Sequence, residues 1–124
     1  MTYSLLLLCR RKAGLTPVEF ENYFETKHVP LIRSLTEDTF PIHQRFYMHR
    51  EEQDGYPAKL LLGSDPNHDA LCIMTWKDEA ASQEYFARIQ EPDSFKQIMD
   101  DDANFVDRPS TTMAVLGSSH TTSA

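Results

Sequence analysis

The chain has 124 residues, two cysteines and a formal net charge of −7, which fits a single globular domain in a reducing compartment. The negative charge and the lack of a basic stripe argue against a nucleic acid as partner. The apolar run at residues 5–8 is too short for a secretory signal or a membrane span, so we expect a cytoplasmic protein without a membrane partner.

The first half of the chain predicts a strand, a helix and a second strand. A strand is predicted from residue 3 to about residue 12, because its apolar run at residues 5–9 is typical of a strand covered on both faces. A capping box begins at Thr16, and the apolar stripe that follows predicts a helix to about residue 35. Pro30 lies inside this helix and predicts a kink in its last turns. Residues 41–50 predict the second strand.

A long connection and a third strand follow. The connection at residues 51–68 contains an apolar stretch, and long loops of this kind are often lids or binding elements. We therefore expect it to cover or line the mouth of a cleft. Residues 69–76 again form a continuous apolar run, which predicts a strand covered on both faces.

The last part of the chain predicts helical structure and a final strand. Asp78 caps a helix, and Pro92 interrupts the chain before a second, shorter helix. Residues 109–116 predict the last strand. The tail at residues 117–124 is small and polar, and we expect it to be disordered. The domain is thus predicted to span residues 1–116.

The element order is strand, helix, strand, strand, helix, strand, which predicts an α+β ferredoxin-like fold. In this βαββαβ arrangement a four-stranded antiparallel sheet carries its helices on one face. Two strands nevertheless have the pattern of strands covered on both sides, so something must cover the second face. The economical cover is the sheet of a second copy. The sequence therefore predicts a homodimer joined through its sheet faces, a dimeric α+β barrel.

Three stretches carry a resemblance to known proteins. Residues 9–20 read Cys-Arg-Arg-Lys-Ala-Gly-Leu-Thr-Pro-Val-Glu-Phe, followed by Tyr23-Phe24 and by His28-Val29-Pro30-Leu31. Residues 101–107 read Asp-Asp-Ala-Asn-Phe-Val-Asp. With the strand at 69–76, these stretches resemble EthD-type dimeric α+β barrel proteins, which include fungal aromatic-polyketide tailoring members. The resemblance covers nearly the whole chain except the 51–68 loop and the tail.

The resemblance implies a cleft between the helices and the sheet of each subunit. It also implies a hydrophobic cyclic small molecule as substrate, often handled without a cofactor. We expect neither a cofactor nor a metal ion, because the five histidines show no local ligand spacing with cysteines or carboxylates.

His28 is the leading candidate for proton transfer. An imidazole titrates near neutrality, and this one lies at the border of the apolar stripe within the His-x-Pro motif. The alternative is a histidine that only caps the carbonyl freed by Pro30. Tyr47 and His49 share a strand face that could turn towards the same cleft and hold an enolate oxygen. The alternative for this pair is an exposed polar strand face.

Five further residues are candidates for substrate binding: Tyr23, Phe24, Lys27, Trp76 and Phe86. Trp76 and Phe86, with Tyr85, could wall a pocket for a flat molecule, or they could simply fill the core, as Tyr23 could. Lys27 falls inside the apolar stripe, where it either looks into a cavity or snorkels past the core edge. Asp101, Asp102 and Asp107 are interpreted as a helix-end cluster that folds and solubilises the chain.

Three functions are compatible with these residues. The favoured hypothesis is a cofactor-free lyase, cyclase or dehydratase that uses acid–base catalysis on an aromatic or polyketide-derived molecule. The second is a cofactor-independent monooxygenase or isomerase working in the same cleft. The third is a barrel that binds a small molecule without converting it. The residues do not distinguish dehydration from ring closure and do not name the substrate.

Overall fold

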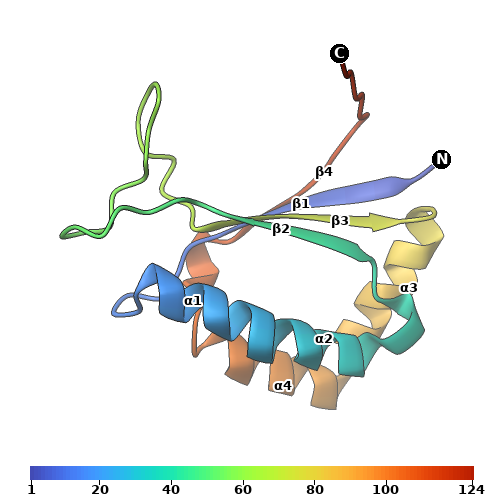
Figure 1. Cartoon of the computed structure of the whole chain (residues 1–124). Helices are drawn as coiled ribbons and strands as arrows, with labels where there is room; N and C mark the ends of the chain where they lie inside the picture. Colours follow the sequence, from blue (N-terminus) through green and yellow to red (C-terminus); the bar gives the residue numbers. More distant parts are fainter.

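The computed structural model describes residues 1–124 and confirms the predicted α+β ferredoxin-like fold. One four-stranded antiparallel sheet has the spatial order β2-β3-β1-β4, and the helices cover one of its faces (Figure 1). The strands are β1 (Tyr3–Cys9), β2 (Ile42–Tyr47), β3 (Ala70–Trp76) and β4 (Thr112–Val115). The helices are α1 (Pro17–Tyr23), α2 (Val29–Thr36), α3 (Glu79–Ile89) and α4 (Pro92–Asp102). None of the helices combines the length and the apolar composition that crossing a membrane requires.

Several element bounds differ from the predicted ones. The first strand ends at Cys9 rather than near residue 12, because Arg11 leaves the ladder and forms an isolated bridge with Val106. The helix predicted to be the shorter one, α4, is 11 residues long, which is also the length of α3. It begins at Pro92, because a proline at the first helical turn gives up an N–H that would have no helical partner there.

The kink predicted at Pro30 is replaced by a π-helical turn in front of it. This turn, η1 (Phe24–His28), joins α1 to α2, and the N–H of Val29 bonds to the carbonyl of Phe24 five residues earlier. The helical rod continues through Pro30 into α2 (Figure 1). A π turn is wider than an α turn, so it accommodates the proline ring that would clash with the carbonyl four residues earlier.

The core lies between the sheet and the helices. Alternate residues of β3, from Ala70 to Trp76, face the helices and are buried. One cluster gathers around Trp76 and Tyr85, and the other gathers around Phe20, Phe24 and Phe105. Cys9 and Cys72 are free thiols in the second cluster, and burial raises the pKa of each to about 12. Both are therefore uncharged at neutral pH, as buried structural cysteines are.

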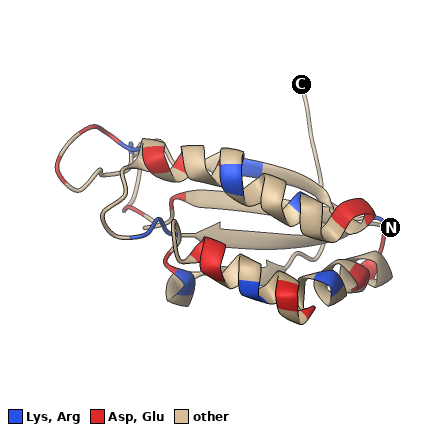
Figure 2. Cartoon of the chain, turned by 90° about the horizontal axis from the view of Figure 1, so that it is seen from below, with Lys and Arg blue, Asp and Glu red and all other residues tan.

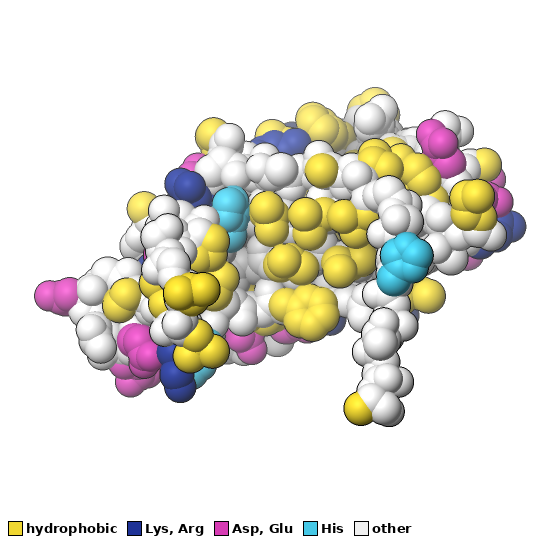
Figure 3. Space-filling model, turned by 90° about the horizontal axis from the view of Figure 1, so that it is seen from above, with side chains coloured by type: hydrophobic (Ala, Val, Ile, Leu, Met, Phe, Trp, Pro, Cys, Tyr) yellow, Lys and Arg dark blue, Asp and Glu magenta, His cyan; other side chains and the backbone are white.

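The two outer surfaces of the molecule differ in character. Acidic and basic residues are interspersed along the helices (Figure 2). The opposite face of the sheet is apolar and uncovered by any helix (Figure 3). By strand alternation and register this open face carries Leu6, Leu8, Ile42, Phe46, Leu71 and Ile73. Phe46 is 54% exposed and Ile42 is 71% exposed, so apolar area remains in contact with water in a single chain.

A buried ion cluster fixes the ends of the long 51–68 connection. The Asp69 carboxylate accepts hydrogen bonds from the backbone N–H and the guanidinium of Arg11, at 2.8 and 2.6 Å. Arg50 Nε lies 3.1 Å from the same carboxylate, but it is not aligned for a hydrogen bond. The other nitrogens of Arg50 bond to Asp65 and to the carbonyl of His68. The charges of Arg50 and Asp69 thus compensate each other in a site that water barely reaches.

Asp69→Asn is predicted to lower the free energy of unfolding by about 3 kcal/mol, because it removes the carboxylate that compensates Arg11 and, together with Asp65, Arg50. Chemical denaturation at one fixed protein concentration measures the change. Asp54→Asn is the control, since Asp54 is an exposed aspartate of the same connection. An equal, small effect of both substitutions would show that the cluster does not hold the connection.

Candidate active site

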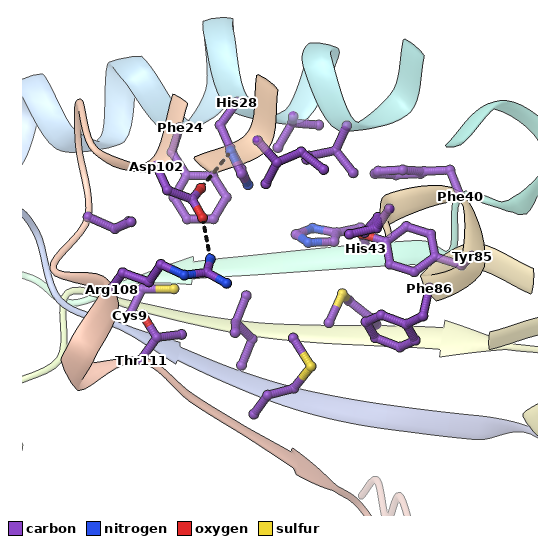
Figure 4. A pocket seen from close by; sticks show the side chains of 18 of the residues that line it. Cys9, Phe24, His28, Phe40, His43, Tyr85, Phe86, Asp102, Arg108 and Thr111 are labelled. Carbon is purple, nitrogen blue, oxygen red and sulfur yellow. Dashed lines mark hydrogen bonds and ion pairs between the residues drawn. The ribbon is translucent and has the colours of Figure 1, made fainter. Parts of the chain in front are cut away.

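A cavity of about 280 Å³ lies between the helical layer and the sheet. Apolar side chains from nearly every element line it, and only a few polar groups reach it (Figure 4). The polar side chains on its wall include His28, His43, Asp102 and Arg108. A mostly apolar cavity with a few convergent polar groups is the usual form of a small-molecule site.

His28 is held in place by the π turn and by aromatic packing. Its ring centroid lies 4.8 Å from that of Phe105 and 5.1 Å from that of Phe24. Its Nδ1 lies 2.7 Å from Asp101 Oδ2, a charge-assisted hydrogen bond between η1 and α4. Because a carboxylate only accepts, Nδ1 carries the hydrogen of this bond. The opposite nitrogen, Nε2, makes no hydrogen bond within the protein and is free to act on a molecule in the cavity.

The pKa values of two neighbouring carboxyl groups at the end of α4, Asp101 and Asp102, are shifted in opposite directions. Burial alone would raise the pKa of Asp101, but hydrogen bonds from His28 and from the Tyr23 hydroxyl outweigh it and lower the pKa. Burial raises the pKa of Asp102, although His28 and Arg108 oppose the rise. Asp102 Oδ2 lies 2.7 Å from Arg108 Nη1, and its other oxygen lies 3.7 Å from His28 Nδ1. Hydrogen bonds thus favour the anionic form of Asp101, whereas burial disfavours the anionic form of Asp102.

His43 contributes a second imidazole, from β2 on the sheet side of the cavity (Figure 4). Burial first, and then the charge of Arg45, lower the pKa of His43 to about 4. Arg45 Nη1 lies 3.0 Å from His43 Nδ1. Arg45 itself is held by both oxygens of Glu25, at 2.6 and 2.9 Å. The two histidines therefore differ in character, because His28 is paired with an anion and His43 with a cation.

Three of the residues named from the sequence lie together at the cavity: His28, Phe24 and Phe86. Tyr23 does not line it, but its hydroxyl donates to Asp101 Oδ1 at 2.8 Å and so supports the partner of His28. Trp76 also lies outside the lining. It is 5% exposed, and its indole N–H donates to the Thr39 carbonyl, which makes it a core residue.

The strand-face interpretation needs correction for Tyr47 and His49. Tyr47 packs on Phe24, and its hydroxyl donates to Glu25 at 2.6 Å, so it faces the helices without reaching the cavity. His49 lies beyond the end of β2 and is exposed. Lys27 is also exposed, because the π turn rotates it out of the expected apolar stripe. The 51–68 connection contributes no residue to the cavity, so the expectation that it lines the mouth is wrong for this chain alone.

Sequence reasoning missed His43 and Arg108 and undervalued the two aspartates. Asp101 lies 73 residues from His28, and no local spacing signals such a pair. His43 had a usable signal, because it shares a strand face with Arg45 and Tyr47. The alternation of β2 places all three towards the helices, and only the packing decides which of them reaches the cavity.

One group of side chains has the composition of a cation site. Ligand atoms of His28, Asp101 and Asp102 lie within 4.8 Å of one another. Asp101 already accepts hydrogens from His28 and Tyr23, and Asp102 is paired with Arg108. A cation would have to displace these partners, so the donor set fits proton transfer better than metal binding.

The structure defines a class of protein, the ferredoxin-like α+β domains, and this one has a cavity between its helices and its sheet. The EthD domain matches residues 12–109, and the chain belongs to the EthD domain family. A comparison with functionally curated proteins gives no match.

Solved structures of low sequence identity share the fold. An EthD family protein from Bacillus halodurans has a TM-score of 0.60 at 13% identity, with 96% of this chain and 100% of that chain covered. SnoaB from Streptomyces nogalater, a cofactor-independent oxygenase, has a TM-score of 0.55 at 14% identity, with 97% and 95% covered. A dimeric ferredoxin-like protein from Thermobifida fusca has a TM-score of 0.53 at 14% identity, with 94% and 90% covered.

The two aspartates are predicted to respond in opposite ways to neutralisation at pH 7. The lowered pKa of Asp101 means that its charge stabilises the fold above the ordinary aspartate pKa of 3.8, and that this stability is lost as the pH falls. Asp101→Asn should therefore cost about 1–2 kcal/mol at pH 7. The raised pKa of Asp102 means that its charge destabilises the fold at pH 7, so Asp102→Asn should match or exceed the wild type.

Thermal unfolding of the two variants at pH 7 and pH 3 measures this difference. The deficit of Asp101→Asn should shrink at pH 3, where the wild-type carboxyl is also becoming neutral. Equal destabilisation by both substitutions at pH 7 would contradict the assignment of the two carboxyls.

Proposed function

We propose that this protein is a cofactor-free acid–base enzyme, of the lyase, cyclase or dehydratase type, that acts on an aromatic or polyketide-derived ring compound. The observation that carries the proposal is the His28–Asp101 pair on the wall of a mostly apolar cavity. An Asp–His pair of this geometry fixes the tautomer of the imidazole and stabilises the imidazolium that forms.

The proposed step is abstraction of a proton next to a carbonyl group. His28 Nε2 takes the proton, and the electron pair of the broken C–H bond moves onto the carbonyl oxygen to give an enolate. In a dehydration the enolate then expels a neighbouring hydroxyl group, to which His28 returns the proton, so that water leaves. In a cyclisation the enolate carbon attacks a second carbonyl, and the same proton goes to the new alkoxide.

Asp102 and Arg108 supply the polar environment of this step. Asp102 lines the cavity beside His28, and its raised pKa makes it the carboxyl that most readily shares a proton there. Arg108 balances its charge from the cavity wall. Apolar side chains elsewhere limit access of water, which strengthens every electrostatic interaction within.

A cofactor-independent monooxygenase is the second candidate, favoured by one observation. SnoaB, whose fold this chain shares, is a cofactor-independent oxygenase. The same base would form the substrate anion, and dioxygen would then be the oxidant. Oxygen uptake with a dihydroxynaphthalene separates the two reactions, because a lyase consumes none. A barrel that binds its ligand without turnover is the third candidate, and it predicts ligand binding that survives loss of His28.

The proton-transfer proposal is tested with 2-tetralone, a bicyclic ketone with an acidic α-carbon. The wild type should accelerate exchange of this proton for deuterium in heavy water, followed by NMR. His28→Ala and His28→Gln should each lower the rate by roughly two to four orders of magnitude, the usual contribution of a positioned acid or base. His120→Gln is the control, since His120 lies in the exposed tail.

The Gln variant separates catalysis from structure. An amide can keep the hydrogen bond to Asp101 but cannot carry the proton. Full exchange activity in a folded His28→Gln protein would refute the catalytic role. An inactive His28→Gln protein with native stability would support it.

We further propose that the protein works as a homodimer joined through its open sheet face. The apolar side chains of that face have no cover within the chain, and a structural neighbour is a dimeric ferredoxin-like protein (Figure 3). The exposed leucines of the long connection, Leu61 and Leu62, belong to a loop that rises on the same side of the sheet (Figure 1). Burial of this area in a dimer would supply the hydrophobic stabilisation that the single chain lacks.

Light scattering at micromolar concentration is expected to report twice the chain mass. Phe46→Glu should shift the protein to a monomer, because it places a charge on the apolar face that forms the proposed interface. Val18→Glu is the control, since Val18 is 70% exposed on α1, on the other side of the molecule. A wild-type monomer, or a Phe46→Glu dimer of undiminished stability, would contradict the proposal.

A further inference from the structure

The second imidazole of the cavity has a fixed hydrogen-bonding role that the acid–base proposal does not use. His43 lines the cavity from β2, and its ring stacks on Phe40 with the centroids 5.7 Å apart and the planes at 26°. Arg45 Nη1 approaches its Nδ1 at 3.0 Å. A guanidinium nitrogen can only donate, so Nδ1 must accept and carries no hydrogen. A neutral imidazole has one ring hydrogen, and here it must lie on Nε2.

Nothing in the protein accepts that hydrogen. The ring of His43 makes its one side-chain hydrogen bond through Nδ1, and Nε2 is not among the enclosed polar atoms without a partner. It therefore keeps some exposed surface, and the residue lines the cavity. Figure 4 shows the ring extending into the space between the helices and the sheet, opposite the side from which His28 enters.

A chain of contacts holds this arrangement from outside the cavity. Glu25 binds Arg45 through two hydrogen bonds and also accepts the hydroxyl hydrogen of Tyr47. The hydrogen bonds from Arg45 lower the pKa of Glu25, which remains an anion at neutral pH. The lowered pKa of His43, caused by burial and by Arg45, keeps the imidazole neutral. The charged or titratable groups that act on His43 are thus Arg45, His28 and Glu25.

We propose that His43 binds an oxygen atom of the ligand through its Nε2 hydrogen, and that the ligand is a ring compound with a carbonyl or phenolic oxygen directed towards β2. Arg45 and Glu25 are positioning residues, because they act through His43. The inference rests on the proposed function only in assuming that the cavity receives the substrate. It names the substrate class further, since the oxygen faces β2 while the carbon that loses its proton faces His28.

During enolisation, negative charge forms on the carbonyl oxygen of the ligand. A neutral N–H donor stabilises negative charge that develops on the carbonyl oxygen, and it does not protonate the oxygen in the ground state. Burial and the charge of Arg45 keep His43 neutral, so it acts as a hydrogen-bond donor and not as a second charged group of the cavity. One cavity thus holds a base and an oxygen-binding donor without mutual neutralisation.

The test compares binding of 2-tetralone with binding of tetralin, which has the same ring system without the oxygen. The single tryptophan, Trp76, packs on Tyr85 and Phe86 of the cavity wall, so its fluorescence reports occupancy. We compare the dissociation constant of tetralin divided by that of 2-tetralone. This ratio cancels differences between variants in how tightly the cavity binds the shared ring system. His43→Phe keeps a ring on Phe40 but removes the donor. In this variant the ratio should fall about two- to tenfold, because 2-tetralone loses one hydrogen bond and tetralin loses none.

A nitrogen-15 NMR spectrum of the histidines at pH 7 gives the second readout. His43 should show a hydrogen on Nε2 and none on Nδ1, and the Nε2 signal should shift when 2-tetralone is added. Arg45→Met should let the two tautomers mix, while Arg10→Met, an exposed arginine, should leave the His43 signals unchanged. These measurements need no turnover, so they are decided independently of the exchange activity of His28.

An unchanged ratio in a folded His43→Phe protein would overturn the inference, as would failure of the wild type to bind 2-tetralone. A hydrogen on Nδ1 of His43, or an imidazolium at pH 7, would overturn it as well. If proton exchange depends on His28 while the ratio of dissociation constants is unchanged in His43→Phe, only the present inference fails. If the ratio changes in His43→Phe while the exchange rate is unchanged in the His28 variants, only the proton-transfer proposal fails.

Discussion

The arrangement of the site depends on the packing of Phe105 against the first helical segment. Phe105 is 1% exposed, and its ring lies 4.9 Å from that of Tyr23, 5.4 Å from that of Phe24 and 4.8 Å from that of His28. These contacts join the segment after α4 to α1 and η1, which are distant in sequence. The hydrogen bond between His28 and Asp101 spans the same junction, so the aromatic packing sets the distance over which that bond forms. A small shift of α4 would break it.

The cavity has two ends of different chemistry, and the fold keeps them apart. The end formed by η1, α4 and the segment after α4 holds His28, Asp102 and Arg108, and Asp101 binds His28 from outside the cavity lining. The end formed by β2 holds a neutral imidazole backed by a cation and an anion outside the cavity. Buried ionisable groups cost stability unless they are paired, and burial raises the pKa of Asp102 although Arg108 is paired with it. A carboxyl kept at such a cost is more readily explained by a role at the site than by folding.

Local signals in the sequence predict the elements well, and tertiary contacts decide the site. The capping box at Thr16 and the cap at Asp78 mark helix starts that the structure reproduces. Pro30 shows where local signals stop predicting the structure. The kink that a proline favours is replaced by a π turn, and the position of that turn depends on packing. His28 could be singled out from its motif and its place on the stripe. Its partner Asp101 could not, because the distance between them in the chain is bridged only in the folded protein.

A crystal structure of the protein with 2-tetralone tests the central claim most directly, because it shows both ends of the cavity at once. We expect the ketone between the helices and the sheet, with its oxygen within hydrogen-bonding distance of His43 Nε2. Its acidic α-carbon should lie next to His28 Nε2, whose Nδ1 remains bonded to Asp101. A ketone bound in the same cavity with its α-carbon away from His28, or bound only elsewhere on the protein, would contradict the account.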